Sequence, residues 1–275
     1  MSAGNLNQEN CEPRELKGSR LFGYAFGTFG QMTPIGLFNA FSYQYYVFTV
    51  GLDPLFTAIG VFMGLFLFAI CSPIFGVIID NKNPGKLGKR RPFLLAGMPM
   101  LFILMIIAWT PPMCPRDDPF YLPTALYFWF ICICLYASQG LLVSAYLSML
   151  AEQSTTNENR MKVASLQGLF SILGTIMSIF LPIIMQSRLE DPQNAFHTTD
   201  SGQYLIRIMP WVGLMFGVAG LVSFICTFLS VDEGFFKTDC TAQIKSQSVQ
   251  ESFRQIFVPT RDPQYRMWMG NAFFF

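Results

Sequence analysis

The stretch that decides the fold reads Gly76-Val-Ile-Ile-Asp80-Asn-Lys-Asn-Pro-Gly85-Lys-Leu-Gly88-Lys89-Arg90-Arg91-Pro92-Phe93. It separates two long apolar runs, of which the first ends at Asp80 and the second opens at Pro92. Five of the chain's 18 Lys and Arg residues lie in it, and cationic loops stay on the cytoplasmic side of a membrane. The stretch therefore predicts a short cytoplasmic loop between two membrane-spanning helices.

Four residues of this stretch have predicted structural roles. Gly76 lacks a side chain, which allows a neighbouring backbone to approach closely inside the bilayer. Asp80 places a carboxylate at the membrane edge, where it can cap a helix N-terminus or pair with a cation. Gly85 and Gly88 allow a tight turn.

The composition predicts an all-α polytopic membrane protein. Of 275 residues, 52% are hydrophobic and 13% are charged, which is about half the charged fraction of a soluble domain. The net charge of +1 suggests no nucleic-acid partner. Residues 1–20 are polar, so we expect no cleavable signal peptide. The seven scattered Cys and the single His197 form no metal-ligand spacing and no nucleophile–base set. We therefore expect no catalytic residue, metal site, cofactor or enzyme activity.

Six apolar runs are long enough to cross a bilayer, which takes about 20 residues. They are residues 21–49, 55–79, 92–110, 121–150, 163–187 and 208–231. A seventh run begins near Tyr265, and we expect residues 265–275 to be the truncated start of another helix. The predicted organisation is a cytoplasmic tail (1–20), a six-helix transmembrane bundle (21–231), a cytoplasmic linker with an amphipathic helix (232–264) and this truncated start.

The distribution of positive charge predicts the orientation. Segments 1–20, 80–92, 151–162 and 232–266 lie on one side and hold 3, 5, 2 and 5 Lys and Arg residues. The other side holds only Arg116, Arg188 and Arg207. The excess of positive charge marks the cytoplasmic side. We expect a multi-pass protein of the cell membrane with a cytoplasmic N-terminus.

Neutral polar side chains fall on one face of three predicted helices. In the first helix they are Thr28, Gln31, Asn39, Ser42 and Tyr46, at offsets of 3, 8, 3 and 4. Gln139 and Tyr146 share a face of the fourth helix, and Gln167 begins a similar stripe in the fifth. Because an unpaired amide is costly in hydrocarbon, these groups either bond to neighbouring helices or face a watery cavity. We expect Gln31, Asn39, Gln139, Tyr146 and Gln167 to contact substrate.

A second set of residues is expected to act at the cytoplasmic end. Glu152 ends the fourth predicted helix and can pair with an Arg of the 88–91 cluster. An ion pair that forms in only one conformation can act as a latch between conformations. The predicted latch consists of Gly76, Asp80, Gly88, Arg90, Arg91 and Glu152.

The spacing of Gly76-x-x-x-Asp80 followed by Gly88-Lys-Arg-Arg resembles the loop between helices 2 and 3 of major facilitator transporters. The long spacer, the Arg-Pro at its end and Tyr24-x-Phe26-Gly27-x-Phe29-Gly30 resemble the glycoside–pentoside–hexuronide:cation symporter branch, which is melibiose-permease-like. The resemblance runs from Leu21 to Phe275. It implies a fold of two six-helix bundles around a central site, of which this chain holds the N-terminal bundle and the start of helix 7.

The charged site of that branch is not matched here. Where its members carry carboxylates and an Arg, the matching positions are Met32, Phe68, Ser72, Val143 and Gln167. Intramembrane charges are the usual marks of ion coupling, so coupling through this half is not expected. Na⁺ or H⁺ can still couple through residues of the missing half.

The predicted function is secondary transport of a small neutral polar solute, a sugar or glycoside, by rocker-switch alternating access. An uncharged site suits such a solute because amides and hydroxyls bond to sugar hydroxyls and aromatic rings pack on a sugar's apolar face. Two alternatives remain open at this point. The lack of intramembrane charge also fits a transporter-like receptor or sensor, and the high Phe content fits a transporter of amphiphiles or lipids. The expected partners are this solute and the lipid bilayer.

Overall fold

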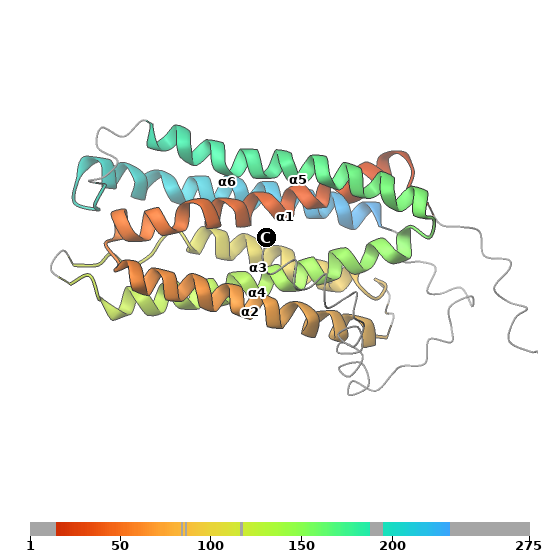
Figure 1. The fold of residues 1–275 in the computed structure, drawn as a ribbon, viewed down its shortest axis with the longest axis horizontal. Coiled ribbons are helices and arrows are strands. Elements are labelled where there is room, and N and C mark those ends of the chain that lie inside the picture. Colours follow the sequence, from red (N-terminus) through yellow and green to blue (C-terminus); the bar gives the residue numbers. More distant parts are fainter. Residues whose placement is uncertain (1–14, 84, 86, 116–117, 188–194, 232–275) are drawn as a thin grey trace, which may run out of the picture.

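The computed structural model describes residues 15–83, 85, 87–115, 118–187 and 195–231. Within them the chain is all-helical, in the order α1 (Gly18–Gln44), the π-helical segment η1 (Tyr45–Val50), α2 (Pro54–Asn81), α3 (Arg91–Ile107), α4 (Leu122–Gln153), α5 (Asn157–Gln186) and α6 (Asp200–Ser230). Figure 1 shows these helices lying side by side. Each of the six predicted spans coincides with a helix. The predicted linker 232–264 and the start of another helix at 265–275 lie outside the described residues.

The largest difference from the predicted bounds is at the start of α6. The helix begins at Asp200, whereas the apolar run alone predicted residue 208. The hydroxyl of Thr199 caps the helix by accepting a hydrogen bond from the Gly202 amide, at 3.2 Å. The first two turns of α6 are polar, so a prediction from hydropathy missed them. Arg207 therefore lies two turns inside α6 rather than in the preceding loop.

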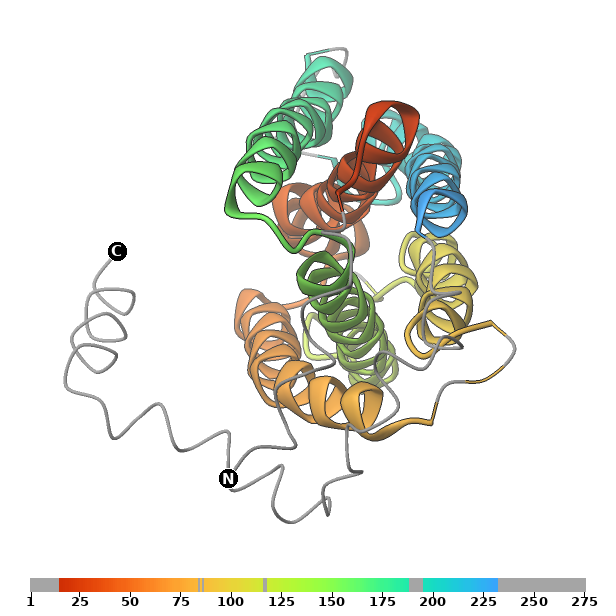
Figure 2. The same cartoon turned by 90° about the vertical axis from the view of Figure 1, so that its right-hand side faces the viewer.

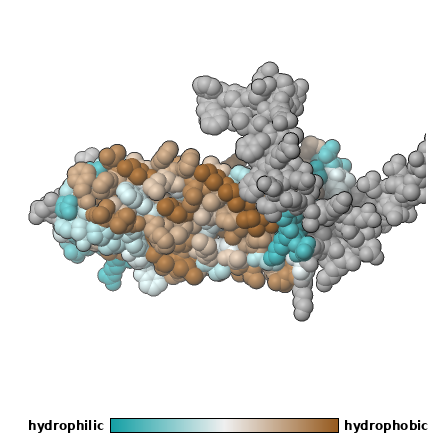
Figure 3. All heavy atoms as spheres, turned by 90° about the horizontal axis from the view of Figure 1, so that it is seen from below, coloured by the Kyte–Doolittle hydropathy of each residue, from teal (hydrophilic) through white to brown (hydrophobic). Residues whose placement is uncertain are grey.

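Four helices, α2, α4, α5 and α6, are long and apolar enough to cross a membrane. The helix α3 is apolar but has only 17 residues. The helix α1 is long enough at 27 residues, but its glycines and polar side chains such as Gln31 make it less apolar. Figure 3 shows hydrophobic side chains along the middle of one face and hydrophilic ones near its ends, as a bilayer requires.

The helices pack with an internal twofold pattern. The helix α2 packs along α4 as α5 packs along α1, and α3 packs on α4 as α6 packs on α1. The helices α3 and α6 also contact each other. Exchanging helices 1–3 with helices 4–6 leaves this pattern unchanged, and α1 and α4 run in opposite directions. Figure 2 shows the packing end-on, with α5 and α6 beside α1 in the upper part of the view and α2 and α3 beside α4 in the lower part. The arrangement is that of an inverted repeat.

The helices α1 and α6 approach each other closely along a row of glycines. The Gly30 amide donates a hydrogen bond of 3.0 Å to the Ser223 hydroxyl. A Cβ atom at Gly30 would lie 2.5 Å from the Cβ atom of Ser223 and 2.9 Å from the backbone oxygen of Gly220. Gly23 faces Ser230 and Gly27 faces Thr227 in the same way. Glycines therefore set the distance between these two helices.

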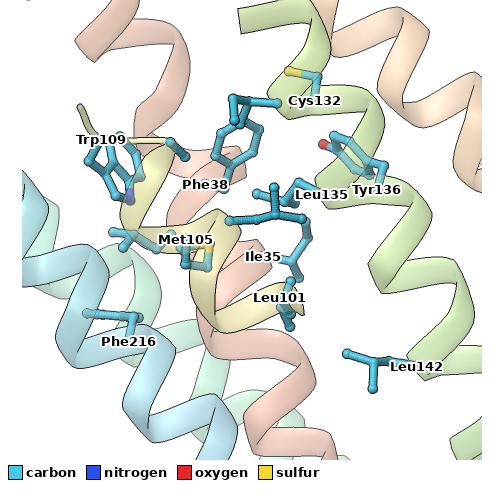
Figure 4. Packing of buried hydrophobic residues seen from close by; sticks show 14 of the residues in the cluster. Ile35, Phe38, Leu101, Met105, Trp109, Cys132, Leu135, Tyr136, Leu142 and Phe216 are labelled. Carbon is cyan, nitrogen blue, oxygen red and sulfur yellow. The ribbon is translucent and has the colours of Figure 1, made fainter. Parts of the chain in front are cut away.

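A large aromatic and aliphatic core joins the helices near the end where α3 stops. Figure 4 shows Phe38 of α1, Met105 of α3, Leu135 of α4 and Phe216 of α6 converging there. All four are buried. Because lipid tails are as apolar as these side chains, the core stabilises the bundle by close packing rather than by exclusion of water.

Tyrosine hydroxyls complete the C-terminal end of the short helix α3. Tyr46 donates a hydrogen bond to the Ala108 carbonyl at 2.7 Å, and Tyr45 donates to the Trp109 carbonyl at 3.2 Å. Tyr127 donates to the Ile107 carbonyl at 2.6 Å. Carbonyls at the end of a helix lack donors from a following turn, and an unpaired carbonyl in a bilayer is costly. The Ile107 carbonyl also accepts a hydrogen bond from the Thr110 amide at 3.0 Å. The three phenols explain how a helix of this length ends inside an apolar bundle.

The glycine contact predicts opposite effects for one substitution at two positions. We expect Gly30→Ala to lower the free energy of unfolding by about 1–3 kcal/mol, because its methyl group overpacks a contact that includes backbone. We expect Gly168→Ala on α5, where a Cβ atom would meet no other described helix within 4 Å, to be neutral or stabilising by up to about 1 kcal/mol. Thermal unfolding of the full-length protein in detergent measures both. Equal losses of unfolding free energy in the two variants would contradict the conclusion that Gly30 sets the distance between α1 and α6.

Candidate functional site

The loop between α2 and α3 is closed by a tight turn. The amide of Gly85 donates to the carbonyl of Gly88 at 3.2 Å, and the amide of Gly88 donates back at 3.1 Å. Gly88 has φ +88°, a left-handed conformation that favours glycine. The predicted turn at these two glycines is present. It brings the basic residues that follow to the ends of α2 and α4.

The guanidinium of Arg90 joins two carboxylates. One of its terminal nitrogens lies 3.1 Å from Asp80 Oδ1 at the end of α2 and 2.8 Å from Glu152 Oε1 at the end of α4. The Arg90 side chain is only 9% exposed, and that of Glu152 is 21% exposed. The pairing expected between Glu152 and the basic cluster is therefore made by Arg90. Its role as a latch is taken up below as a proposal.

Arg91 reaches a different helix. Its guanidinium donates a hydrogen bond of 2.6 Å to the carbonyl of Phe228 and lies 4.3 Å from the centre of the Phe228 ring. Phe228 lies in the last turn of α6, where the backbone carbonyls carry a partial negative charge. Adjacent arginines therefore tie the start of α3 to α4 on one side and to α6 on the other.

The close approach predicted at Gly76 is not made by the described helices. No atom of the described residues lies within 4 Å of the position that a Cβ atom would take at Gly76. The close approach of a neighbouring backbone is therefore not made within the described helices. In α2 the close contacts occur at Gly60 and Gly64, which face aromatic rings of α4.

Tyr146 is the centre of a polar network that joins three helices. Its hydroxyl donates to the Tyr24 carbonyl of α1 at 2.8 Å and accepts from the Gln167 amide of α5 at 2.8 Å. The Thr28 hydroxyl lies 3.0 Å away. Tyr24 in turn donates to the Tyr146 carbonyl at 2.7 Å, and the two rings stack at 4.8 Å. Tyr146 and Gln167, both expected to contact substrate, are thus bonded to the protein itself.

A second polar group lies nearer the middle of the bundle. Tyr136 of α4 donates a hydrogen bond of 2.5 Å to Asn39 Oδ1 of α1. Gln139 lies three residues along α4 from Tyr136, on the same face. It is buried at 4% exposure, and its Oε1 has no hydrogen-bond donor in the described part of the chain. Gln31 is half-buried and makes no hydrogen bond among the described residues.

The predicted polar face of the first helix contains both exposed and buried side chains. Asn39 is exposed, whereas Thr28, Ser42 and Tyr46 are buried within the bundle. Thr28 and Tyr46 form hydrogen bonds with neighbouring segments of the bundle. Of the two alternatives for polar groups in this helix, bonding to other helices rather than facing a watery cavity therefore holds for them. The polar residues predicted from the sequence did not include Tyr24 and Tyr136, because aromatic rings are typical of an apolar core. Tyr24 lies four residues from Thr28, and Tyr136 lies three from Gln139. These offsets place both tyrosines on the polar faces of their helices and could have identified them.

Charged side chains in the described helices stay near helix ends. The deepest are Lys162, the sixth residue of α5, and Arg207, the eighth residue of α6. No group of three or more His, Cys, Asp or Glu residues that could hold a metal ion occurs in the described ranges. The central part of the bundle therefore offers amides, hydroxyls and aromatic rings.

Comparison with known proteins places this geometry in a family. A family model described as MFS/sugar transport protein matches residues 19–275. The "Uncharacterized symporter YnaJ" of Bacillus subtilis (strain 168) is 22% identical over 233 residues, covering 84% of this chain and 47% of the relative. The "Uncharacterized symporter YjmB" of the same organism is 38% identical over 91 residues, covering 32% of this chain and 20% of the relative. The chain thus spans less than half the length of either relative.

The Arg90 contact predicts a loss of stability that a surface ion pair does not share. We expect Arg90→Gln to lower the free energy of unfolding by about 1–3 kcal/mol, because it leaves the half-buried Glu152 carboxylate without this cation. Lys162→Gln removes an ion pair with Glu158 whose side chains are 62% and 76% exposed, and should change stability far less, because water screens such a pair. Thermal unfolding of the full-length protein measures the difference. Similar losses in the two variants would refute it.

Proposed function

The chain belongs to the MFS/sugar transport protein family, and we propose that it forms the first bundle of a secondary transporter for a small neutral polar solute, a sugar or glycoside. The family consists of transporters and the chain is not an enzyme. It is an integral membrane protein, since four of its helices can span a bilayer. Residues 1–20 and 232–264 would be the cytoplasmic tail and linker around the bundle 21–231.

The observation that carries the proposal is the buried amide of Gln139. An amide without its hydrogen bonds in an apolar environment costs about 1–3 kcal/mol by protein mutational data. Oε1 of Gln139 is an acceptor, and a hydroxyl of a bound solute would supply the donor that the described helices lack. Tyr136 lies on the adjoining turn of α4 and bonds to Asn39 of α1, and these two residues add further hydrogen-bonding groups.

The neutrality of this region supports a neutral solute. Gln31, Asn39 and Gln139 each offer both donors and acceptors, which matches a molecule whose hydroxyls do both. Phe38 packs against Tyr136, with ring centres 6.3 Å apart, so aromatic surface is close to the amides. Tyr146 and Gln167 would contact solute after their network with Tyr24 and Thr28 opens.

The ion-paired end supports alternating access. A contact that holds one end of the bundle closed must be breakable at little cost when the conformation changes. The contact of Arg90 with Asp80 meets this requirement, because the Asp80 side chain is 59% exposed and water can replace the cation there. Glu152 is less exposed, so its carboxylate would need another partner in the second conformation. We propose that this end is cytoplasmic, in accordance with the distribution of Lys and Arg, and that the cell membrane holds the protein.

Solute uptake tests the proposal. We expect the full-length protein in liposomes to take up neutral sugars or glycosides saturably. An imposed Na⁺ or H⁺ gradient tests coupling, and gradient-driven accumulation would place the coupling groups in the part of the protein beyond these helices. Control liposomes hold the Asn39→Leu variant, which should take up solute about tenfold more slowly because one hydrogen-bonding group is lost. Saturable uptake of charged solutes alone would overturn the neutral site.

Two glutamine variants separate solute binding from structure. Gln139→Leu removes a buried amide whose oxygen has no donor in the described helices, so we expect it to raise the free energy of unfolding by about 1–3 kcal/mol and to slow uptake about tenfold. Gln167→Leu removes the hydrogen bond to Tyr146 and should lower stability by about 1 kcal/mol. Thermal unfolding and uptake are measured on the same preparations. A Gln139→Leu variant with normal uptake, or one as unstable as Gln167→Leu, would contradict the assignment.

A further inference from the structure

A groove of about 450 Å³ lies between the first turn of α1 and the first three to four turns of α5. One wall is Leu21 and Phe22 of α1, and the other is a single face of α5 that runs from Glu158 to Leu169. The groove lies on the outside of the bundle, and none of the proposed solute-binding residues lines it. Phe22 and Leu169 are 57% and 59% exposed.

The groove changes from charged to apolar along its length. At its mouth Glu158 and Lys162 form an ion pair of 2.7 Å. Ser165 follows one turn later, and Leu166 and Leu169 form the inner end. Eleven residues separate Glu158 from Leu169, which is about 16 Å along a helix. One leaflet with its headgroups is about 20 Å deep, so the groove covers most of the depth of one lipid molecule.

The mouth of the groove is built on a fixed support. The side-chain amide of Asn159 donates to the Leu16 carbonyl at 2.9 Å, and its Oδ1 accepts from the Leu16 amide at 3.1 Å. The Thr156 hydroxyl donates to Glu15 at 3.3 Å. A hydrogen bond from Lys17 and its charge lower the pKa of Glu15, so this carboxylate is ionised at neutral pH. The segment before α1 is thereby tied to the start of α5.

We propose that this groove binds a zwitterionic phospholipid of the leaflet in which α5 begins. The Lys162 ammonium faces the lipid phosphate, and the Glu158 carboxylate faces the positively charged headgroup amine. One acyl chain lies along Leu166 and Leu169, against Phe22. The charge pair matches a headgroup that carries both signs better than one that carries a single negative charge, because Glu158 repels the latter. The inference rests on membrane insertion and does not depend on the proposed solute.

Photocrosslinking in mixed nanodiscs tests this proposal. The photoreactive amino acid p-benzoylphenylalanine replaces Leu169 in the full-length protein, and nanodiscs contain equal amounts of phosphatidylcholine and phosphatidylglycerol with the same acyl chains. Mass spectrometry gives the ratio of the two lipids in the adducts. The matched control replaces Ile103, which is 52% exposed, is the thirteenth residue of α3 as Leu169 is of α5, and lies outside the groove.

We expect the ratio of phosphatidylcholine to phosphatidylglycerol adducts to be about threefold higher at position 169 than at position 103. A preference of this size corresponds to the binding free energy that exposed ion pairs contribute. Adding Glu158→Gln and Lys162→Gln should reduce the ratio to the control value. Equal ratios at the two positions, or enrichment of phosphatidylglycerol at position 169, would overturn the proposal. Crosslinks from position 169 to protein instead of lipid would show that another part of the full-length protein covers the groove, and would also overturn it.

Discussion

The guanidinium of Arg90 lies between the negatively charged C-terminal ends of α2 and α4. Both α2 and α4 end with an acidic residue and without a basic residue in the last turn, and the carbonyls at a helix C-terminus already carry partial negative charge. Asp80 and Glu152 therefore need a cation between them. Since lipid gives apolar helices little reason to associate, this contact does much to fix how the ends of α2, α3 and α4 meet. Arg91 extends the same constraint to α6 through the Phe228 carbonyl.

The six helices and the pairing of Glu152 with the basic cluster could be predicted from the sequence, because the bilayer fixes both the length of an apolar run and the place where charge can lie. The network around Tyr146 could not be predicted in the same way. Whether a polar side chain bonds to a neighbouring helix or to water depends on which residues the packing brings opposite to it. Gly76 shows the same limit, since its sequence context predicts close approach and its surroundings in the described bundle are open.

Polar groups in the bundle fall into two physical classes. Around Tyr146 the donors and acceptors are matched, which holds α1, α4 and α5 together. At Gln139 a buried acceptor is left without a donor, and the bundle gains nothing in stability from it. An unsatisfied group of this kind is expected where function rather than stability sets the residue. The contrast separates polar groups whose hydrogen bonds are already made within the bundle from one that a solute could complete, although the sequence presents all of them as one polar pattern.

The same contrast bears on how the bundle can move. The contact of Gly30 with Ser223 and Gly220 holds α1 against α6 backbone to backbone, and packed interfaces of this kind resist continuous deformation. Rocker-switch transport requires each bundle to move as a rigid body and to change contacts only at its ends and outer faces. In this bundle the breakable ion pairs lie at one end and the least buried helices are α2 and α5. Rigid packing inside and exchangeable contacts outside are therefore built from different residues, so one can be altered by substitution without the other.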